Sequence, residues 1–162
     1  MNMLKTLFTV LALSFSLNSL AITDDEQVEF SDGLTEGKMK VVEKFVNADK
    51  NIVNEKFFGW APLQMASNRG QMEVVKYLLS KGADINYIHP VAYHTAFHLA
   101  ALNGHLALAK FLASKGADVN IKLKADVSLI RYFRDAGSPE MVKAMTDLGV
   151  KDDGCLESKC FE

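Results

Sequence analysis

The sequence is poor in cysteine and has no apolar run long enough to span a membrane. Its 162 residues include two cysteines, Cys155 and Cys160, both close to the C-terminal end. The most apolar stretch runs from Leu7 to Leu17, far below the roughly 20 residues that a membrane-spanning helix needs. An uncleaved membrane anchor is therefore the weaker interpretation of this stretch.

Neither sign of charge dominates the chain. Lysine and arginine number 18 against 20 aspartate and glutamate residues, and the formal net charge is −2. Nucleic-acid-binding proteins usually present a basic face, whereas Lys40 here lies between Glu36 and Glu43, as on an ordinary solvated helix. We therefore expect no nucleic acid partner.

The residue types that enzymes and metal sites use are present but not arranged for chemistry. A Ser-His-Asp triad needs a serine beside a histidine base, but the serines here lie at caps, turns or repeat ends: Ser67, Ser80, Ser114 and Ser128. No glycine-rich loop has the placement that phosphate binding requires. His94 and His98 have the spacing of ligands on one helix face, but no third ligand is in register. We expect no enzymatic activity, no metal and no cofactor.

The first 21 residues have the three regions of a secretory signal peptide. Lys5 supplies the basic region, residues 7–17 the apolar region, and Ser19-Leu20-Ala21 the cleavage motif. We expect cleavage after Ala21 and no membrane association afterwards, and the lack of a cysteine directly after Ala21 argues against a lipoprotein. Loss of Lys5 leaves 17 basic residues from the original 18, so the mature chain has a formal net charge of −3.

Glycines recur at a nearly constant interval, which indicates an internal repeat. The intervals of 33, 34 and 33 residues separate Gly37, Gly70, Gly104 and Gly137. The segments that end on two of these glycines correspond: Ala61-Pro62-Leu63-Gln64-Met65-Ala66-Ser67-Asn68-Arg69-Gly70 and Thr95-Ala96-Phe97-His98-Leu99-Ala100-Ala101-Leu102-Asn103-Gly104. Further along come Gly82-Ala83-Asp84-Ile85-Asn86 and Gly116-Ala117-Asp118-Val119-Asn120. Together these motifs resemble the ankyrin repeat, whose pattern is Thr-Pro-Leu-His, two alanines, Gly-His, a valine-rich helix and Gly-Ala-Asp-Val-Asn.

The resemblance implies an all-α solenoid of about four helix-turn-helix repeats with extended β-turn fingers. We place the repeats at about 26–55, 56–88, 89–122 and 123–151, in one domain of residues 22–150 followed by a tail of residues 152–162. In the second repeat we expect helices over 62–69, opening on a proline, and over 72–81, closed by Gly82. The terminal repeats depart from the pattern and are expected to cap the stack, with Ser138 as N-cap of the last helix.

Two of the four histidines have structural roles in the family pattern. The position of His98 belongs to a histidine whose ring bonds a nearby threonine hydroxyl, here Thr95, and the backbone. His105 is the usual residue after the turn glycine. Neither histidine is therefore expected to be a ligand or a catalytic base.

The tail cysteines are expected to form a disulfide. Four residues separate Cys155 from Cys160, a ring that disulfide geometry accommodates, and an exported chain meets an oxidising compartment. A redox-active pair usually has a Cys-X-X-Cys spacing, which this pair lacks.

Proteins that resemble this one bind partners on a concave side formed by the finger tips and the first helices. The repeat register places these predicted partner-binding residues there: Phe57, Phe58, Trp60, Asn68, Arg69, Tyr87, Val91, Tyr93, His94, Leu102, Asn103, Lys124 and Asp135. The aromatic members are unusual because ankyrin fingers are typically polar, and aromatic side chains dominate binding energy at interfaces. In the alternative, one or two of them, Phe57 and Tyr87 first, fold back over the neighbouring repeat.

Small exported chains with little besides such repeats look like the periplasmic kind found in Gram-negative bacteria. That kind is known for immunity, in which it binds and blocks a toxic effector such as a phospholipase, and for peroxide resistance beside a periplasmic catalase. A structural scaffold is a third alternative. Inhibition needs buried anchors in a tight interface, which favours immunity. We expect a periplasmic monomer that binds another protein on its concave face.

Overall fold

The computed structural model describes residues 22–154, so the predicted signal peptide and the Cys155–Cys160 pair lie outside the described residues. Within 22–154 the chain forms α-helices, two short 3-10 helices and two isolated β-bridges. The helices are α1 (Asp24–Glu36), α2 (Met39–Ala48), η1 (Lys50–Asn54), α3 (Pro62–Asn68), α4 (Met72–Ser80), α5 (Ala96–Leu102), α6 (Leu106–Ser114), η2 (Lys124–Asp126), α7 (Leu129–Asp135) and α8 (Pro139–Asp147).

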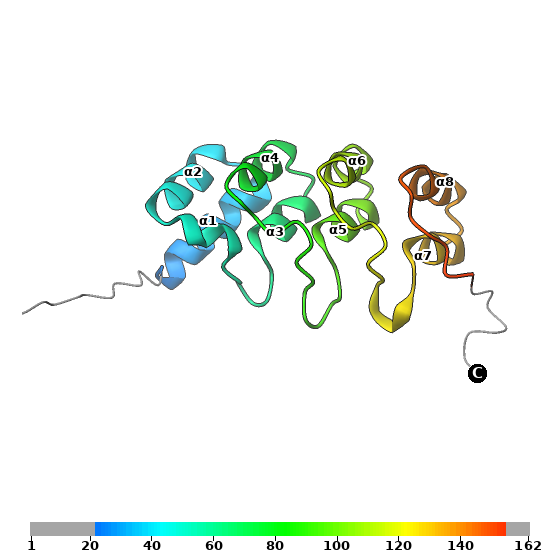
Figure 1. Cartoon of the computed structure of the whole chain (residues 1–162). Helices are drawn as coiled ribbons and strands as arrows, with labels where there is room; N and C mark the ends of the chain where they lie inside the picture. Colours follow the sequence, from blue (N-terminus) through cyan, green and yellow to red (C-terminus); the bar gives the residue numbers. More distant parts are fainter. Residues whose placement is uncertain (1–21, 155–162) are drawn as a thin grey trace, which may run out of the picture.

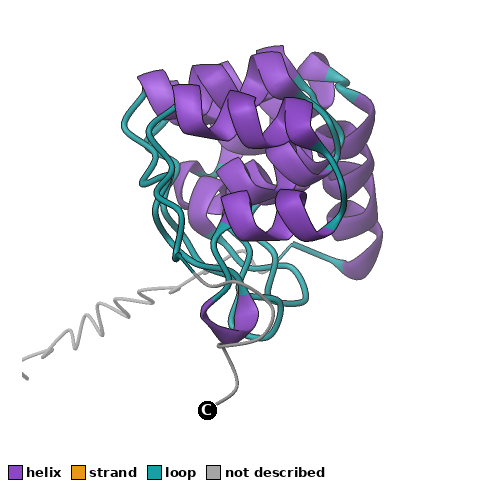
Figure 2. Ribbon diagram, turned by 90° about the vertical axis from the view of Figure 1, so that its right-hand side faces the viewer, coloured by secondary structure: helices purple, strands orange, loops and turns teal. Residues whose placement is uncertain are grey.

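The helices are stacked as antiparallel pairs in two rows (Figure 1). An inner row consists of α1, α3, α5 and α7, and the fingers project beyond it; an outer row consists of α2, α4, α6 and α8. Figure 2 shows the two rows end-on, with the finger loops on one side of the stack. In the first three repeats the inner helices pack directly on one another, α1 on α3 and α3 on α5. The structure confirms the predicted all-α repeat solenoid.

The first repeat begins with the longest of the helices described in residues 22–154, and the repeat pattern defined this helix poorly. Thr23 and Glu26 form a capping box, in which the Glu26 carboxylate accepts from the backbone N–H of Thr23 at 2.9 Å. This bond lowers the pKa of the Glu26 carboxyl group. α1 has 13 residues, against 7 in each of α3, α5 and α7. One flank of α1 is exposed along its length, with Asp24, Val28 and Asp32 among its exposed residues.

Glycine and proline set the ends of the other helices largely as predicted. Pro62 is the first residue of α3, and Gly82 follows the end of α4 with a left-handed φ of 88°, a conformation that glycine adopts without a steric cost. The Ser138 prediction is confirmed in position but not in hydrogen bonding. Ser138 is the N-cap residue of α8, but its side chain makes no capping hydrogen bond, because its ψ of 75° is far from the extended conformation that capping residues typically adopt.

The core lies between the two rows and continues from repeat to repeat. Apolar side chains at helical spacing supply it from the outer row: Val42, Phe45 and Val46 in α2, Val74, Val75 and Leu78 in α4, and Leu108, Ala109 and Leu112 in α6. Full burial of one leucine stabilises the fold by roughly 1.5–3 kcal/mol. Since each core layer is shared between neighbours, no single helix pair could bury its apolar face alone.

Asparagine side chains connect successive repeats above the fingers. Each Oδ1 atom accepts a backbone N–H about one repeat further along the chain, at 2.8–2.9 Å: Asn54 from Asp84, Asn86 from Asp118, and Asn120 from Lys151. Two of these asparagines end the repeated glycine-initiated motif. These asparagine hydrogen bonds hold the bases of the fingers relative to one another, and the last of them links the third repeat to the fourth.

Candidate protein-binding face

Three fingers project from the inner row, and we name them finger A (residues 55–60), finger B (87–94) and finger C (122–127). Finger A is a tight hairpin in which Phe57 and Trp60 exchange both backbone hydrogen bonds, at 2.9 and 3.0 Å. The two residues at its tip, Phe58 and Gly59, have φ values of 52° and 83°. This pair of positive φ angles is that of a type I′ turn, where Asn-Gly is the preferred sequence. Phe58 is 95% exposed.

Finger B is wider and is organised by a buried histidine. The ring Nδ1 atom of His89 accepts hydrogen bonds from the backbone N–H groups of Val91 and Ala92 at 3.2 and 3.0 Å. The backbone N–H of His89 donates to the backbone carbonyl of His94 at 2.9 Å. Tyr93 has a φ of 59°. The loop leaves Val91 70% and Tyr93 47% exposed, so finger B also presents apolar side chains at its tip.

Finger C repeats the backbone strain without the aromatic side chain. Its tip residues Ala125 and Asp126 have φ values of 62° and 59°, and Lys124 beside them is exposed. Every finger thus holds at least one non-glycine residue in the left-handed region, which costs on the order of 1 kcal/mol or more per residue. Strain of this kind persists where the surrounding structure imposes it, and it is concentrated at functional sites.

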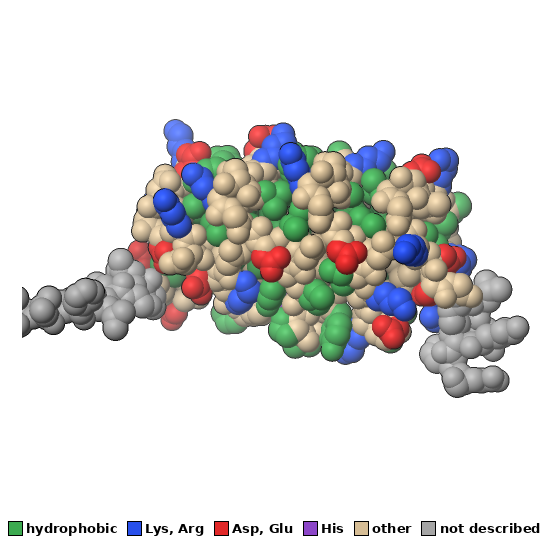
Figure 3. Space-filling view, viewed as in Figure 1, with side chains coloured by type: hydrophobic (Ala, Val, Ile, Leu, Met, Phe, Trp, Pro, Cys, Tyr) green, Lys and Arg blue, Asp and Glu red, His purple; other side chains and the backbone are tan. Residues whose placement is uncertain are grey.

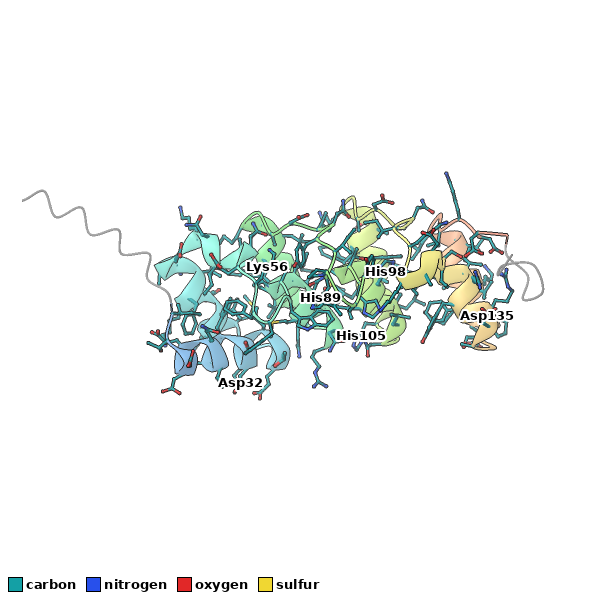
Figure 4. The ribbon with its side chains drawn as sticks, turned by 90° about the horizontal axis from the view of Figure 1, so that it is seen from below. Asp32, Lys56, His89, His98, His105 and Asp135 are labelled. Atoms are coloured by element: carbon teal, nitrogen blue, oxygen red, sulfur yellow. The ribbon has the colours of Figure 1, made fainter. Side chains whose placement is uncertain are left out.

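Fingers A and B contact each other and form one unit. The Trp60 ring lies 4.0 Å from the His89 ring, centroid to centroid. The Tyr87 hydroxyl donates to the carbonyl of Gly59 at 2.9 Å, and the Lys56 Nζ atom lies 4.2 Å from the centre of the Tyr87 ring. Figure 4, seen from the finger side, shows Lys56 and His89 in this contact region. The exposed side chains of the two fingers are therefore held at a fixed spacing.

The structure corrects the predicted set at two aromatic positions. Phe57 is buried, and its ring packs 5.7 Å from the Phe30 ring of α1, because its side chain points inward from the hairpin whose tip displays Phe58. Tyr87 is half-buried against finger A. Both therefore follow the alternative in which they fold back over a neighbour. Trp60 is half-buried by its contact with His89, and Leu102 is half-buried against the core.

Polar residues of the inner helices lie between the fingers and the core. The Asn103 Nδ2 atom donates to Asn68 Oδ1 at 3.0 Å, which joins two neighbouring repeats. Trp60, Asn68 and Arg69 line one cavity of about 210 Å³ along α3. The fold therefore brings together three of the residues that the repeat register predicted for the binding face.

The remaining predicted residues lie toward the far end of the stack. Lys124 lines a separate groove between fingers B and C, together with Tyr93. Asp135 at the end of α7 lies 3.7 Å from the Nε atom of Arg131 and is far from finger A (Figure 4). The predicted set is thus an extended surface rather than a single pocket.

The histidines are held by the fold. His98 is fully buried; its Nε2 atom donates to the carbonyl of Ile121 at 2.9 Å, and its Nδ1 atom accepts from the backbone N–H of Thr95 at 3.1 Å. The predicted bond between the ring and the Thr95 hydroxyl is not formed. The hydroxyl instead accepts the backbone N–H of His98 at 3.2 Å, because Thr95 and His98 form a capping box. His105 bonds the carbonyl of Asn68 at 3.3 Å. Among residues 22–154, no group of three histidine, cysteine, aspartate or glutamate side chains could hold a metal ion.

Burial also changes how two of these rings titrate. Burial lowers the pKa of His98 to about 4, with a smaller lowering contribution from His94, while the Ile121 carbonyl and Asp118 oppose the shift. Burial, followed by the nearby His89, lowers the pKa of His94. Both rings are therefore neutral near pH 7, which suits the hydrogen bonds of the His98 ring to the backbone of Thr95 and Ile121.

Two features of this face were missed by sequence reasoning. His89 was not assigned a role, although a histidine before Pro90 in the longest finger could have indicated a loop-forming side chain. Val28, which is 60% exposed on α1, was also missed because the first helix does not follow the repeat motif.

Figure 3 shows apolar side chains gathered along the lower edge of the molecule, over the fingers.

Stacked helix pairs with projecting fingers, and exposed residues in register along one edge, define a helical-repeat binding scaffold. The family described as ankyrin repeats, in three copies, matches residues 34–122, more than half of the chain. The chain belongs to the ankyrin repeat family. The helices α7 and α8 lie beyond the matched residues and add a fourth helix pair.

Curated relatives match a shorter part of the chain. An ankyrin repeat, SAM and basic leucine zipper domain-containing protein 1 from Notamacropus eugenii is 32% identical over 65 residues, which is 40% of this chain and 14% of that protein. The protein of the same name from Carollia perspicillata is 28% identical over 74 residues, 46% of this chain and 16% of that protein. The chain therefore spans only a small part of the length of these relatives.

Ankyrin repeats mediate binding to other proteins, and their fold is a binding scaffold. The chain is accordingly a protein–protein interaction module. None of the helices within residues 22–154 has the length and apolar character needed to cross a membrane.

Proposed function

We propose that this chain is an exported inhibitor that binds and blocks another protein, with a toxic phospholipase in the periplasm as the expected class of target. Residues 1–21 direct export, and the mature chain starts at Ile22 and acts as a monomer. The binding face consists of the tips of fingers A and B together with the inner helices. Its anchors are Phe58, Val91 and Tyr93, with Trp60 and Arg69 beside them.

The display of Phe58 is the observation that carries this proposal. A phenylalanine at a left-handed tip position is strained, and one that is 95% exposed gains almost nothing from the hydrophobic effect in the free protein. Neither property helps the chain to fold. Both are understandable if a partner buries the ring, because aromatic anchors in well-packed pockets supply most of the binding energy of an interface.

The product of a neighbouring open reading frame is the partner to test first. If that gene encodes a secreted lipase, we expect the purified chain of residues 22–162 to bind it and to abolish its activity at an equimolar ratio. Binding is measured by calorimetry and inhibition by hydrolysis of a lipid substrate. If the neighbouring gene instead encodes a catalase, and the chain leaves the activity of a secreted lipase unchanged, the inhibitor assignment is contradicted.

Export is tested independently of the partner. The protein released by osmotic shock from cells that express the full sequence is expected to begin at Ile22. Ile22 packs against the core and directly precedes the cap residue Thr23, so cleavage there leaves the fold of α1 complete. Intact-mass measurement decides the matter, since an exported protein that keeps residues 1–21 contradicts the predicted cleavage.

A further inference from the structure

A shallow groove of about 400 Å³ separates α1 from finger A. Its lining consists of Asp24, Gln27, Val28, Ser31, Asp32, Phe57, Phe58 and Met65. Val28 and Phe58 are the exposed apolar residues of this lining. The groove thus has an apolar centre that the free protein leaves open to water.

The two aspartates of the groove form no ion pairs in the described part of the chain, although Asp32 lies near enough to Lys38 to add, after Glu36, to the raised pKa of that lysine. α1 contains no lysine or arginine. Its Glu29 and Glu36 are paired with Lys44 and Lys38 of the second helix region, at 2.8 and 2.6 Å. Asp24 and Asp32, which line the groove, are exposed and form no ion pair with any residue in the described part of the chain.

The spacing of these residues defines what the groove can accept. Asp24, Val28 and Asp32 are four residues apart in turn, so they form one stripe along the exposed face of the helix. At a rise of 1.5 Å per residue, the two carboxylates are separated by roughly 12 Å along the helix axis. Two cationic side chains about two turns apart on a facing helix have the same separation, and an apolar side chain between them would lie over Val28.

We propose that this groove binds a basic amphipathic helix of the partner protein. One apolar side chain of that helix lies between Val28 and Phe58, and two lysine or arginine side chains pair with Asp24 and Asp32. The inference rests on the proposed function in taking the partner to be a protein bound at the finger face, and it adds the chemistry of the bound segment.

The charge pattern decides between this occupant and the chain's own undescribed segments. Residues 1–21 contain one basic side chain, Lys5, and residues 155–162 contain one, Lys159. Neither segment can supply two cations two turns apart. A partner helix with the stated pattern satisfies both carboxylates and covers the apolar centre, in the manner of an amphipathic helix in a groove.

A pair of synthetic peptides tests the groove without the natural partner. Both have the same leucine face and roughly four helical turns, and they differ only in bearing lysine or glutamate beside that face. In NMR titrations of isotope-labelled residues 22–162, the lysine peptide is expected to shift signals of α1 and finger A, and the glutamate peptide is not. Equal binding of both peptides, or shifts confined to the outer helices, would overturn the inference.

Matched variants make the test specific. The double variant Asp24→Asn/Asp32→Asn is expected to weaken binding of the lysine peptide about tenfold, as the loss of two exposed ion pairs predicts. Asp25→Asn is the control, because Asp25 lies on the same turn of α1 but does not line the groove. Urea unfolding of each variant verifies that the fold is retained. Unchanged peptide binding by the folded double variant would contradict the pairing.

The natural partner separates this inference from the proposed function. If the partner binds the Asp24→Asn/Asp32→Asn variant as tightly as the original chain but binds Tyr93→Asn weakly, the groove is not used and the finger face still is, because Tyr93 is an exposed residue of finger B that does not line the groove. If both variants bind like the original chain, the finger face itself is not the binding site. If both bind weakly, the groove and the finger act together, as we propose.

Discussion

Replacing Phe58 by asparagine is expected to stabilise the free protein while weakening its complex. Asn-Gly is the preferred type I′ pair, and removal of a bulky residue from a φ of 52° should raise the free energy of unfolding by about 1 kcal/mol. Loss of the aromatic anchor should weaken partner binding by about 2 kcal/mol, roughly thirtyfold in Kd. Urea unfolding and calorimetry on the same preparations measure the two effects.

Two control substitutions separate strain relief from loss of the anchor. Ala125→Gly relieves a φ of 62° at the tip of finger C while removing only a methyl group, so it should stabilise the chain and leave binding almost unchanged. Leu78→Ala opens a cavity at a fully buried position and should cost ~2–5 kcal/mol of stability. If Phe58→Asn destabilises the protein as much as Leu78→Ala, Phe58 belongs to the core and not to a binding face.

Acidification is expected to destabilise the fold through His98. The pKa of His98 is about 4 in the folded protein, below the usual value of 6.5, so the unfolded chain binds more protons between these values. The free energy of unfolding should therefore be at its full value above about pH 6.5 and fall as the pH decreases toward 4, by up to about 3 kcal/mol. The lowered pKa of His94 acts in the same direction. Urea titrations at a series of pH values measure this slope.

The chain itself suggests the control for the pH experiment. Gln64 occupies the position of His98 in the preceding repeat, where its Oε1 accepts from the N–H of Ala61 at 3.0 Å and its Nε2 donates to the carbonyl of His94 at 2.7 Å. His98→Gln can adopt the same arrangement without a titrating group. We expect this variant to fold and to lose most of the slope between pH 6.5 and 4. An unchanged slope would show that His98 is not its source.

The sequence predicted the stack well because repeated motifs carry local physical signals. The glycine interval, Pro62 and the Gly82 cap located the second repeat to within a residue at each helix end. The first helix was less well defined, since α1 has no preceding neighbour and needs only one apolar stripe. Its boundary depends on a capping box at Thr23 that lies outside the repeat motif.

The binding face was predicted by position but not by the direction of each side chain. In the two-residue hairpin of finger A, adjacent side chains differ in burial: Phe57 is buried and Phe58 is exposed. The segment is too short for a periodicity in the sequence to distinguish them. The contact of His89 with Trp60 joins residues of two repeats, so only the folded structure reveals it. The same holds for the groove at Asp24 and Asp32.

The central claim is that a protein partner binds the finger face, and hydrogen exchange of the complex tests it most directly. Amide exchange of residues 22–162 is compared with and without the purified partner, peptide by peptide. We expect slower exchange in residues 55–60 and 87–94 and along the exposed flank of α1, with α4, α6 and α8 unchanged. Protection confined to those outer helices, with the fingers unaffected, would contradict the claim.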